Sequence, residues 1–414
     1  MSSDSQRHIE HLAREIGPRP TTSAAERRAA DYVSLELEQF ADEVAVESFG
    51  GLTTFVWMYL TLFLLALIAN ATFFGNPKLA FVASLAVIVF LNQEVNAKGF
   101  FYEFFPKRES QNVIGVIEAA RQPKRRVIIT ANLDTGRDGV LFRPALRRNF
   151  RTLLSVTVSA LILQVTFSLL ALFVGPQPYI LVTMRALGLI ELATVVVLLL
   201  HRYTGQYAPG ANDNASGVAA MLTVGRQLAA SRLPDTEVWL VATGGGRSTQ
   251  SGIIAFLRRH WSEVRGDWFI TLNHVGAGRL AYTLGEGLLK LYAVDPDLIE
   301  RARAIADANP DWEIGEVLNR VEATDLVPLL AMGLRAISLR GEGPDGFGVR
   351  ACSPGDRPET IDGAVLERAS AFALALARAV GRPLGEGDEQ EENQNGDDAA
   401  DGAGSGESGD GAGR

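Results

Sequence analysis

The chain has 414 residues, of which 47% are hydrophobic, and its formal net charge is −9. Residues 386–414 hold ten acids and one arginine, so the tail carries the whole net charge and the remainder is neutral. A neutral body does not indicate a nucleic-acid partner, and we expect none. The single cysteine, Cys352, excludes both a disulfide framework and a cysteine-rich zinc site.

Both ends of the chain are polar. Two helices are expected over residues 3–16 and 22–40, on either side of Gly17-Pro-Arg-Pro20, because the second has apolar residues at a helical period among charges. They are assigned to the opening part of a domain, residues 1–50. The acidic segment 385–414 lacks aromatic residues and cannot bury enough apolar surface to fold, so it is expected to be disordered.

Four apolar segments interrupt the polar sequence in two pairs, and about 20 such residues suffice to cross a bilayer. The segment 79–91 is short for a span, and a buried core helix is the alternative for it. If it did not cross, however, residues 1–48 would lie across the membrane from the sheet they pack on. We therefore predict two transmembrane hairpins, 51–94 and 151–202, whose apolar segments are 52–74, 79–91, 152–174 and 179–200.

Basic residues lie on one side of these hairpins, while the two short hairpin loops carry only Lys78. The excess of Lys and Arg marks the cytoplasmic side of membrane proteins. We expect a multi-pass membrane protein, in contact with the lipid bilayer, whose soluble domain is cytoplasmic. The basic residues are Lys98, Lys107, Arg108, Arg147, Arg148, Arg151 and Arg202.

Strand and helix patterns alternate in residues 95–150 and 203–384. Alternation of this kind predicts an α/β fold of three layers, in which a mostly parallel sheet is covered on both faces. The expected strands are 112–118, 126–131, 236–243, 268–272 and 336–339. The expected helices are 214–230, 251–259, one beginning at Asp295-Pro296, and a last one capped by Asp362 and stopped by Gly381.

The run Gly210-Ala-Asn-Asp-Asn-Ala-Ser-Gly217 has the pattern of a loop entering a closely packed helix, with Asp213 at the mouth of that helix. From the residues alone, a capped turn explains it equally well. The run also resembles the Gly-Ala-x-Asp-Asn-Ala-Ser-Gly signature of the di-zinc aminopeptidases, the clan MH exopeptidases that include leucyl-type aminopeptidases and glutaminyl cyclases. The opening helix after Ile16-Gly-Pro-Arg-Pro20 and the run Pro358-Glu-Thr-Ile-Asp362 are similar to that family too. The resemblance implies a zinc-exopeptidase fold in which Asp213 bridges two metal ions.

The resemblance also implies where the other site residues belong, and most of them are replaced. Asp134, which would orient a metal-binding histidine, is kept, but the histidine is Asn132. Gly245 stands where the family has its general base. The remaining ligand positions are held by Gly246, Asn273 and Cys352.

A catalytic zinc needs three protein ligands and an open position for water. One metal position would have Asn132, Asp213 and Asn273, and the other Asp213, Gly246 and Cys352, so neither has three good ligands. Losing the base alone forfeits ~10²–10⁴ in rate. We expect no cofactor, and zinc only if the chain is active.

Other residues near these positions are weaker candidates. Asp138 and Glu322 are alternative incoming ligands. His274 follows Asn273 and is expected on the opposite face, because neighbouring strand residues alternate. Cys352 is interpreted as a small buried residue more readily than as a reactive thiol.

Two polar residues, Glu191 and Gln164, fall at similar depth in the second hairpin. We expect Glu191 to be protonated or bonded to Gln164, locking the hairpin or pairing chains, and a role in transport is the alternative.

These observations favour a membrane-anchored pseudopeptidase that binds a peptide or a membrane-protein partner at the cytoplasmic face without hydrolysis. The alternatives are an active metallo-aminopeptidase with a rebuilt metal site and a transport component that uses Glu191. The second hairpin enters between Asp134 and Asp213, so the cleft is expected close to the bilayer.

Overall fold

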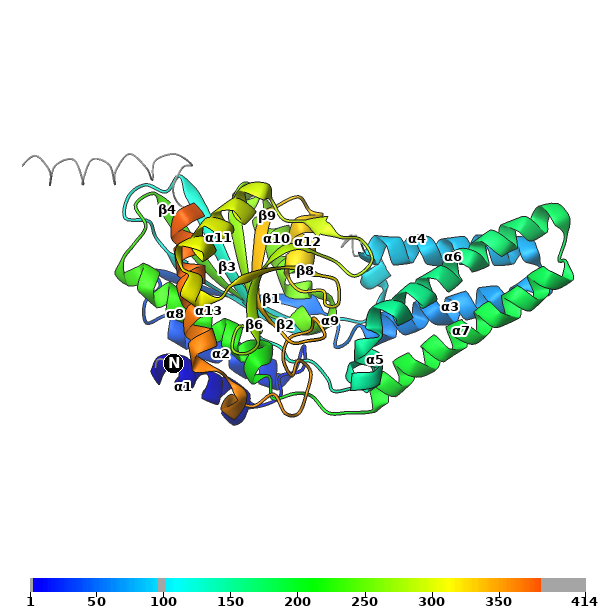
Figure 1. Ribbon diagram of the computed structural model, residues 1–414, viewed down its shortest axis with the longest axis horizontal. Coiled ribbons are helices and arrows are strands. Elements are labelled where there is room, and N and C mark those ends of the chain that lie inside the picture. The colour runs from blue at the N-terminus through cyan, green and yellow to red at the C-terminus, as the bar shows by residue number, and fades with distance from the viewer. Residues whose placement is uncertain (1–2, 96–100, 381–414) are drawn as a thin grey trace, which may run out of the picture.

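The structure is a computed structural model that describes residues 3–95 and 101–380. The acidic tail and the helix stop expected at Gly381 lie outside these residues. Within the described residues a single sheet is covered by helices on both faces, and four long helices project from one end of this domain (Figure 1).

The sheet is mixed, so the expectation of a mostly parallel sheet is wrong. Only the centre, in the order β4-β3-β5-β9, is parallel, while β1, β2, β6 and β7 add antiparallel pairs at the edges and β8 pairs in parallel with β6. The strands are β1 (Glu43–Gly51), β2 (Arg108–Ile117), β3 (Arg125–Asn132), β4 (Thr236–Thr243), β5 (Trp268–Asn273), β6 (Arg279–Glu286), β7 (Tyr292–Ala293), β8 (Gly315–Asn319) and β9 (Arg335–Glu342).

A short connection explains the antiparallel pairing of β6 with β9. A parallel crossover needs about a dozen residues or more. Only residues 274–278 separate β5 from β6, so β6 reverses direction and pairs with β9. The chain between β1 and β2 leaves the sheet as a helical hairpin and returns to the same edge, which also makes these two strands antiparallel.

Alternate side chains of β4 show how the two faces are covered. Leu240 faces Gly225 of α8 (Ser216–Ala230), whereas its neighbour Trp239 faces Phe256 of α10 (Ser251–Val264). Period-2 alternation of large apolar residues therefore serves both layers. The α8 face also carries α2 (Ala24–Leu37) and α13 (Gly363–Val380), and the α10 face carries α12 (Leu326–Ala331).

Most expected helices are present with shifted ends. The remaining elements of the domain are α1 (Ser3–Glu10), a π-helical continuation (His11–Ile16), α5 (Pro144–Arg148), α9 (Gly246–Thr249) and α11 (Pro296–Ala308), together with short 3-10 turns. Asp295 caps α11 and Asp362 caps α13, each through a side-chain oxygen that accepts a backbone N–H of the first turn, as their sequence positions predict.

The four apolar segments are helices, and each is long and apolar enough to cross a membrane. They form a four-helix bundle of α3 (Val56–Phe73), α4 (Pro77–Val95), α6 (Phe150–Val174) and α7 (Pro178–Tyr203), which extends away from the sheet domain (Figure 1). The segment that seemed short, α4, has 19 residues because the helix continues through Asn92, Gln93 and Glu94.

Polar groups inside the bundle pair differently from the expectation. Gln164 donates to Ala66 O (3.0 Å) and Ser84 Oγ (2.8 Å), and its oxygen accepts from Asn70 Nδ2 (3.2 Å). It thereby links α6 to α3 and α4. Glu191 of α7 is buried, and neither of its carboxyl oxygens has a hydrogen-bond partner among the described residues, so the expected Glu191–Gln164 bond is not formed.

We predict that Gln164→Leu destabilises the bundle by about 1–3 kcal/mol, because it removes three hydrogen bonds in an apolar interior and leaves Asn70 with only its bond to Met184 O. Thermal unfolding in detergent checks this. The matched control is Thr166→Val, since the exposed Thr166 hydroxyl donates only to Ile162 O of its own helix. Equal stability of the two variants would contradict the role of Gln164.

Candidate functional site

The carboxyl ends of the central strands converge on Asp213. Asn132 of β3 is paired with Thr243 of β4, and β5 ends beside them at Asn273. Asp213 sits in a π-helical turn, Ala211–Ala215, at the start of α8 and is completely buried. Its N–H and that of Asn212 donate to the Asp356 carboxylate (2.9 and 2.7 Å).

The buried Arg19 side chain fixes the loop before Asp213. Its guanidinium donates to the carbonyls of Pro209 (2.9 Å), Gly210 (3.1 Å) and Leu133 (2.9 Å). One arginine thus ties the chain after β3 to the loop that carries Asp213.

The main partner of Asp213 is Arg247. Its Nη2 donates to Asp213 Oδ1 in a short ion pair and lies 2.9 Å from His274 Nε2, while Nη1 lies 3.5 Å from Glu322 Oε1. Burial alone lowers the pKa of Arg247, but the carboxylates of Asp213 and Glu322 outweigh it and raise the pKa. A fixed positive charge therefore lies against the carboxylate.

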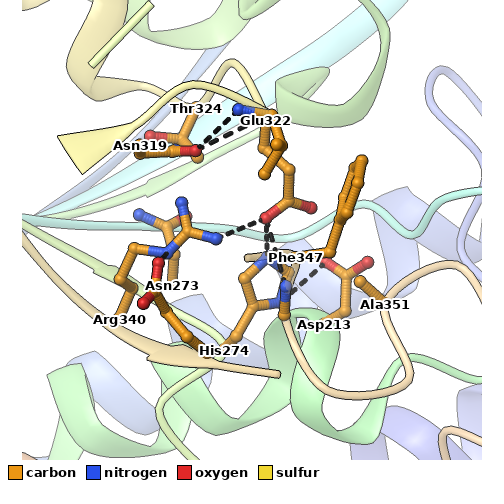
Figure 2. Close-up of polar contacts among 12 residues, drawn as sticks. Asp213, Asn273, His274, Asn319, Glu322, Thr324, Arg340, Phe347 and Ala351 are labelled. Atoms are coloured by element: carbon orange, nitrogen blue, oxygen red, sulfur yellow. Dashed lines mark hydrogen bonds and ion pairs between the residues drawn. The ribbon is translucent and has the colours of Figure 1, made fainter. Parts of the chain in front are cut away.

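His274 lies between the two carboxylates, one ring nitrogen toward each (Figure 2). Its Nδ1 is 3.7 Å from Asp213 Oδ1 and its Nε2 is 3.4 Å from Glu322 Oε2. Strand alternation, which was expected to turn His274 away, does not apply, because His274 follows the end of β5 with φ +56°. The ring packs under Gly348, where a Cβ atom would lie 2.4 Å from its Cγ.

Glu322 joins the group from the loop after β8, so this alternative candidate does reach Asp213's neighbourhood. Its Oε2 accepts from Arg340 Nη2 (2.8 Å) (Figure 2). Burial by itself raises the pKa of Glu322, but His274, Arg340 and Arg247 outweigh that effect and hold the pKa well below its usual range. We call Asp213, Arg247, His274, Glu322 and Arg340 the arginine cluster.

Asp134 positions Arg247 rather than a histidine. Its Oδ2 accepts from Thr21 Oγ1 (2.6 Å) and from the Arg247 N–H (2.9 Å). Its Oδ1 accepts from Asn132 Nδ2 (3.2 Å), so Asn132 is turned toward Asp134. Asp134 was expected to orient a histidine, but here it holds the backbone of α9 at Arg247.

Gly245 and Gly246, in the loop after β4, leave no space for longer side chains. A Cβ at Gly246 would lie 2.6 Å from Asn132 Cβ, and one at Gly245, where φ is +65°, would lie 2.3 Å from Ser251 Oγ. This tight loop brings Arg247 to Asp213. A carboxylate at either position would require the loop to move.

The other two expected ligand positions differ from each other. Asn273 points away from Asp213 and donates to Thr271 Oγ1 (3.3 Å) and Ser338 Oγ (3.1 Å). Cys352 lies beside Asp213, with its N–H 3.2 Å and its Sγ 3.9 Å from Asp213 Oδ2. Burial, reinforced by the Asp213 charge, raises the pKa of the Cys352 thiol well above its usual value, so thiolate is disfavoured.

The donor set does not fit a zinc ion. Among the described residues, no group of three or more His, Cys, Asp or Glu side chains is arranged to hold a metal. His274 uses opposite ring nitrogens toward its two carboxylates, and two guanidinium groups contact those same carboxylates. A divalent ion at Asp213 would therefore meet Arg247 and lack ligands. Asp138 adds none, since it belongs to no such group.

Sequence reasoning missed Arg247, His274 and Arg340 as site residues. The available signal was the position of Arg247, directly after glycines that replace two expected acids. A cation beside an otherwise unneutralised Asp213 is the simplest replacement for lost metal charge. Nothing local to Arg340 in β9 indicates that its guanidinium reaches Glu322.

Further acids are buried around the cluster. Burial raises the pKa of Glu26 to about 8, and the pKa of Asp325 and that of Asp356 to about 7. Asp325 accepts from Thr243 Oγ1 (2.5 Å), and its other oxygen has no partner among the described residues. Such groups favour the protonated form in the folded protein.

We predict that Arg247→Ala lowers the free energy of unfolding by about 3–5 kcal/mol, since it leaves the Asp213 carboxylate buried without its cation. Denaturant unfolding in detergent measures the loss. Arg303→Ala is the control, because Arg303 pairs with Glu316 at the surface (2.8 Å) and its loss costs less than about 1 kcal/mol. A loss for Arg247→Ala no larger than that of the control would refute the ion pair.

We predict that the raised pKa values of Asp325 and Asp356 make the fold less stable as pH rises from about 4 to about 7. An acid whose pKa is higher in the folded than in the unfolded chain binds an extra proton when folded, so releasing that proton destabilises the fold. Asp325→Asn should remove one such contribution and gain about 2 kcal/mol relative to the native chain over this range. Unfolding curves for both chains across this pH range test the sign. If the stability of the variant depends on pH in the same way as that of the native chain, the prediction is contradicted.

Comparisons with known proteins agree with this architecture. No curated protein matches the chain. Residues 191–377 match Peptidase family M28. A zinc aminopeptidase from Bacillus subtilis is similar in structure, with a TM-score of 0.51 and 17% identity over 91% of this chain and 94% of that chain.

Two proteins from Bacteroides thetaiotaomicron are also similar. A glutaminyl cyclase bound to N-acetylhistamine has a TM-score of 0.54 and 14% identity, covering 91% of this chain and 96% of that chain. A leucine aminopeptidase precursor has a TM-score of 0.53 and 14% identity, with the same two coverages. At such identities the likeness concerns the fold alone. Residues 191–377 thus resemble peptidase family M28, and the described residues have the α/β fold of the zinc exopeptidases.

Proposed function

We propose that this chain is a membrane-anchored pseudopeptidase, which keeps the M28 fold and cleft and binds a peptide or another partner without hydrolysing it. The observation that carries the proposal is the Arg247 guanidinium held against Asp213. An arginine supplies the positive charge that Asp213 requires when buried, but it cannot activate a water molecule as a metal ion does.

The state of Glu322 supports the same conclusion. Gly245 stands at the position that the resemblance assigns to the base, and Glu322 is a carboxylate that shares Arg247 with Asp213. Three cationic or hydrogen-bonding neighbours keep the pKa of Glu322 well below its usual range. A carboxylate in that state is a weak proton acceptor at neutral pH.

Membrane insertion is supported by the surface of the four-helix bundle. Large apolar side chains point outward along it, and Phe173, Leu189 and Val182 are 80%, 67% and 63% exposed. An exposed apolar surface of this extent requires a nonpolar environment, and the helices match a bilayer in length. The basic residues near the sheet domain favour a cytoplasmic position for it.

Metal content and hydrolysis distinguish this proposal from an active metallo-aminopeptidase with a rebuilt site. We predict that protein purified without chelators contains far less than one zinc per chain and does not cleave aminoacyl reporters. Elemental analysis and a fluorogenic assay measure both, with the Bacillus subtilis zinc aminopeptidase as the positive control.

An Asp213→Asn variant separates true activity from contamination. Residual cleavage that is unchanged by this substitution comes from another protein. Tightly bound, stoichiometric zinc together with cleavage that Asp213→Asn abolishes would overturn the pseudopeptidase assignment.

A further inference from the structure

A cavity of about 970 Å³ lies between the sheet domain and the base of the four-helix bundle. Arg247 and Cys352 line its floor, whereas Met58 of α3, Leu154 of α6 and Val197 of α7 belong to its apolar wall. Ligand pockets usually measure about 300–1,000 Å³, so this one has room for a large ligand. The polar floor and the apolar wall suit a molecule with one polar and one apolar end.

The charge of the lining favours an anion. Seven lining side chains are Lys or Arg, and two are Glu. Several of the cations pair with acids, but no ion pair among the described residues involves Arg137 or Arg202. Arg137 donates to the carbonyls of Thr204 and Gly205 (both 3.0 Å), just beyond α7, which places its charge at the base of the bundle.

Unsatisfied donors in the same cavity point to a ligand with acceptor atoms. Arg202 and Arg247 both line the cavity, and the Nε–H group of each is buried without a hydrogen-bond partner among the described residues. Buried donors without partners are costly, and acceptor oxygens of a bound molecule would satisfy them.

Aromatic residues place the cavity at the edge of the apolar bundle. The Arg202 guanidinium lies over the rings of Trp57 and Tyr203, 5.7 and 5.5 Å from their centroids. Trp and Tyr gather at the level of lipid headgroups, with Arg reaching toward them. A lipid beside the bundle therefore has its charged group at the height of the cavity.

We propose that the cavity holds an anionic phospholipid from the adjoining leaflet, with its phosphate at Arg137 and Arg202 and an acyl chain along α3, α6 and α7. The inference rests on the proposed membrane insertion and names the partner class that the non-hydrolytic cleft binds. A soluble acidic peptide fits less well, because one wall of the cavity is built from the apolar helices.

The test uses the full chain reconstituted in nanodiscs of phosphatidylcholine with or without phosphatidylglycerol, then transferred to non-ionic detergent. Native mass spectrometry counts the phospholipid that is retained. We expect the native chain to retain phosphatidylglycerol in preference to phosphatidylcholine, and Arg137→Gln/Arg202→Gln to weaken retention at least tenfold. Arg185→Gln is the charge control, since Arg185 is a bundle cation that stacks on Phe74 and does not line the cavity.

A second pair of variants separates the cavity from the bundle surface. Val197→Trp fills the apolar wall and should reduce retention, whereas Val196→Trp adds the same side chain on the exposed side and should not. Unchanged retention by Val197→Trp or by the double arginine variant overturns the inference. So does equal thermal stabilisation by inorganic phosphate alone, which would indicate a simple anion site.

Zinc and peptidase assays on the same preparations keep the two proposals apart. If the native chain retains no phosphatidylglycerol, and shows neither zinc nor hydrolysis, only the lipid inference is refuted. Stoichiometric zinc with cleavage refutes the pseudopeptidase proposal whatever lipid is retained.

Discussion

The ion pair between Arg247 and Asp213 determines the rest of the site. A completely buried carboxylate at the mouth of α8 needs a compensating positive charge, because desolvation of an isolated charge costs several kcal/mol. The glycines before Arg247 let its backbone approach closely, and Asp134 holds its N–H. Glu322 and His274 then complete the surroundings of one guanidinium. The same residues that satisfy the arginine leave no set of ligands for an ion.

Much of the fold could be predicted from local patterns, and the reasons for the failures are physical. Long segments with helical periodicity predicted the helices α8 and α13. Both ends of β4 were predicted at the correct residues. The strands β1, β6, β7 and β8 were missed because their burial alternates weakly or depends on distant partners. The antiparallel direction of β6 follows from its short connection to β5, which a list of isolated strands does not encode.

Only those site residues that a local sequence motif locates could be predicted. Asp213, Asp134 and Cys352 lie together, as the resemblance implied. His274 was excluded by assuming that the strand continued, but the chain turns there with positive φ. Glu322 was only an alternative, and Arg340 was absent from the expectation, because side-chain reach across a sheet edge is a tertiary property.

The four apolar helices and the arginine cluster share one cavity, so these two features of the chain are physically connected. Insertion of α6 and α7 between Asp134 and Asp213 places apolar helices next to the cleft. A cleft walled in this way is less open to water-borne peptides and more suited to a partner from the membrane. In the proposed function, the cleft without hydrolysis and the apolar helices beside it serve the same binding role.

The most direct measurement is anomalous scattering at the zinc edge from crystals of the full chain grown with excess zinc. The account predicts no zinc peak beside Asp213 and a guanidinium density from Arg247 in contact with that carboxylate. A zinc peak coordinated by Asp213, with Arg247 swung away from it, would contradict the central claim.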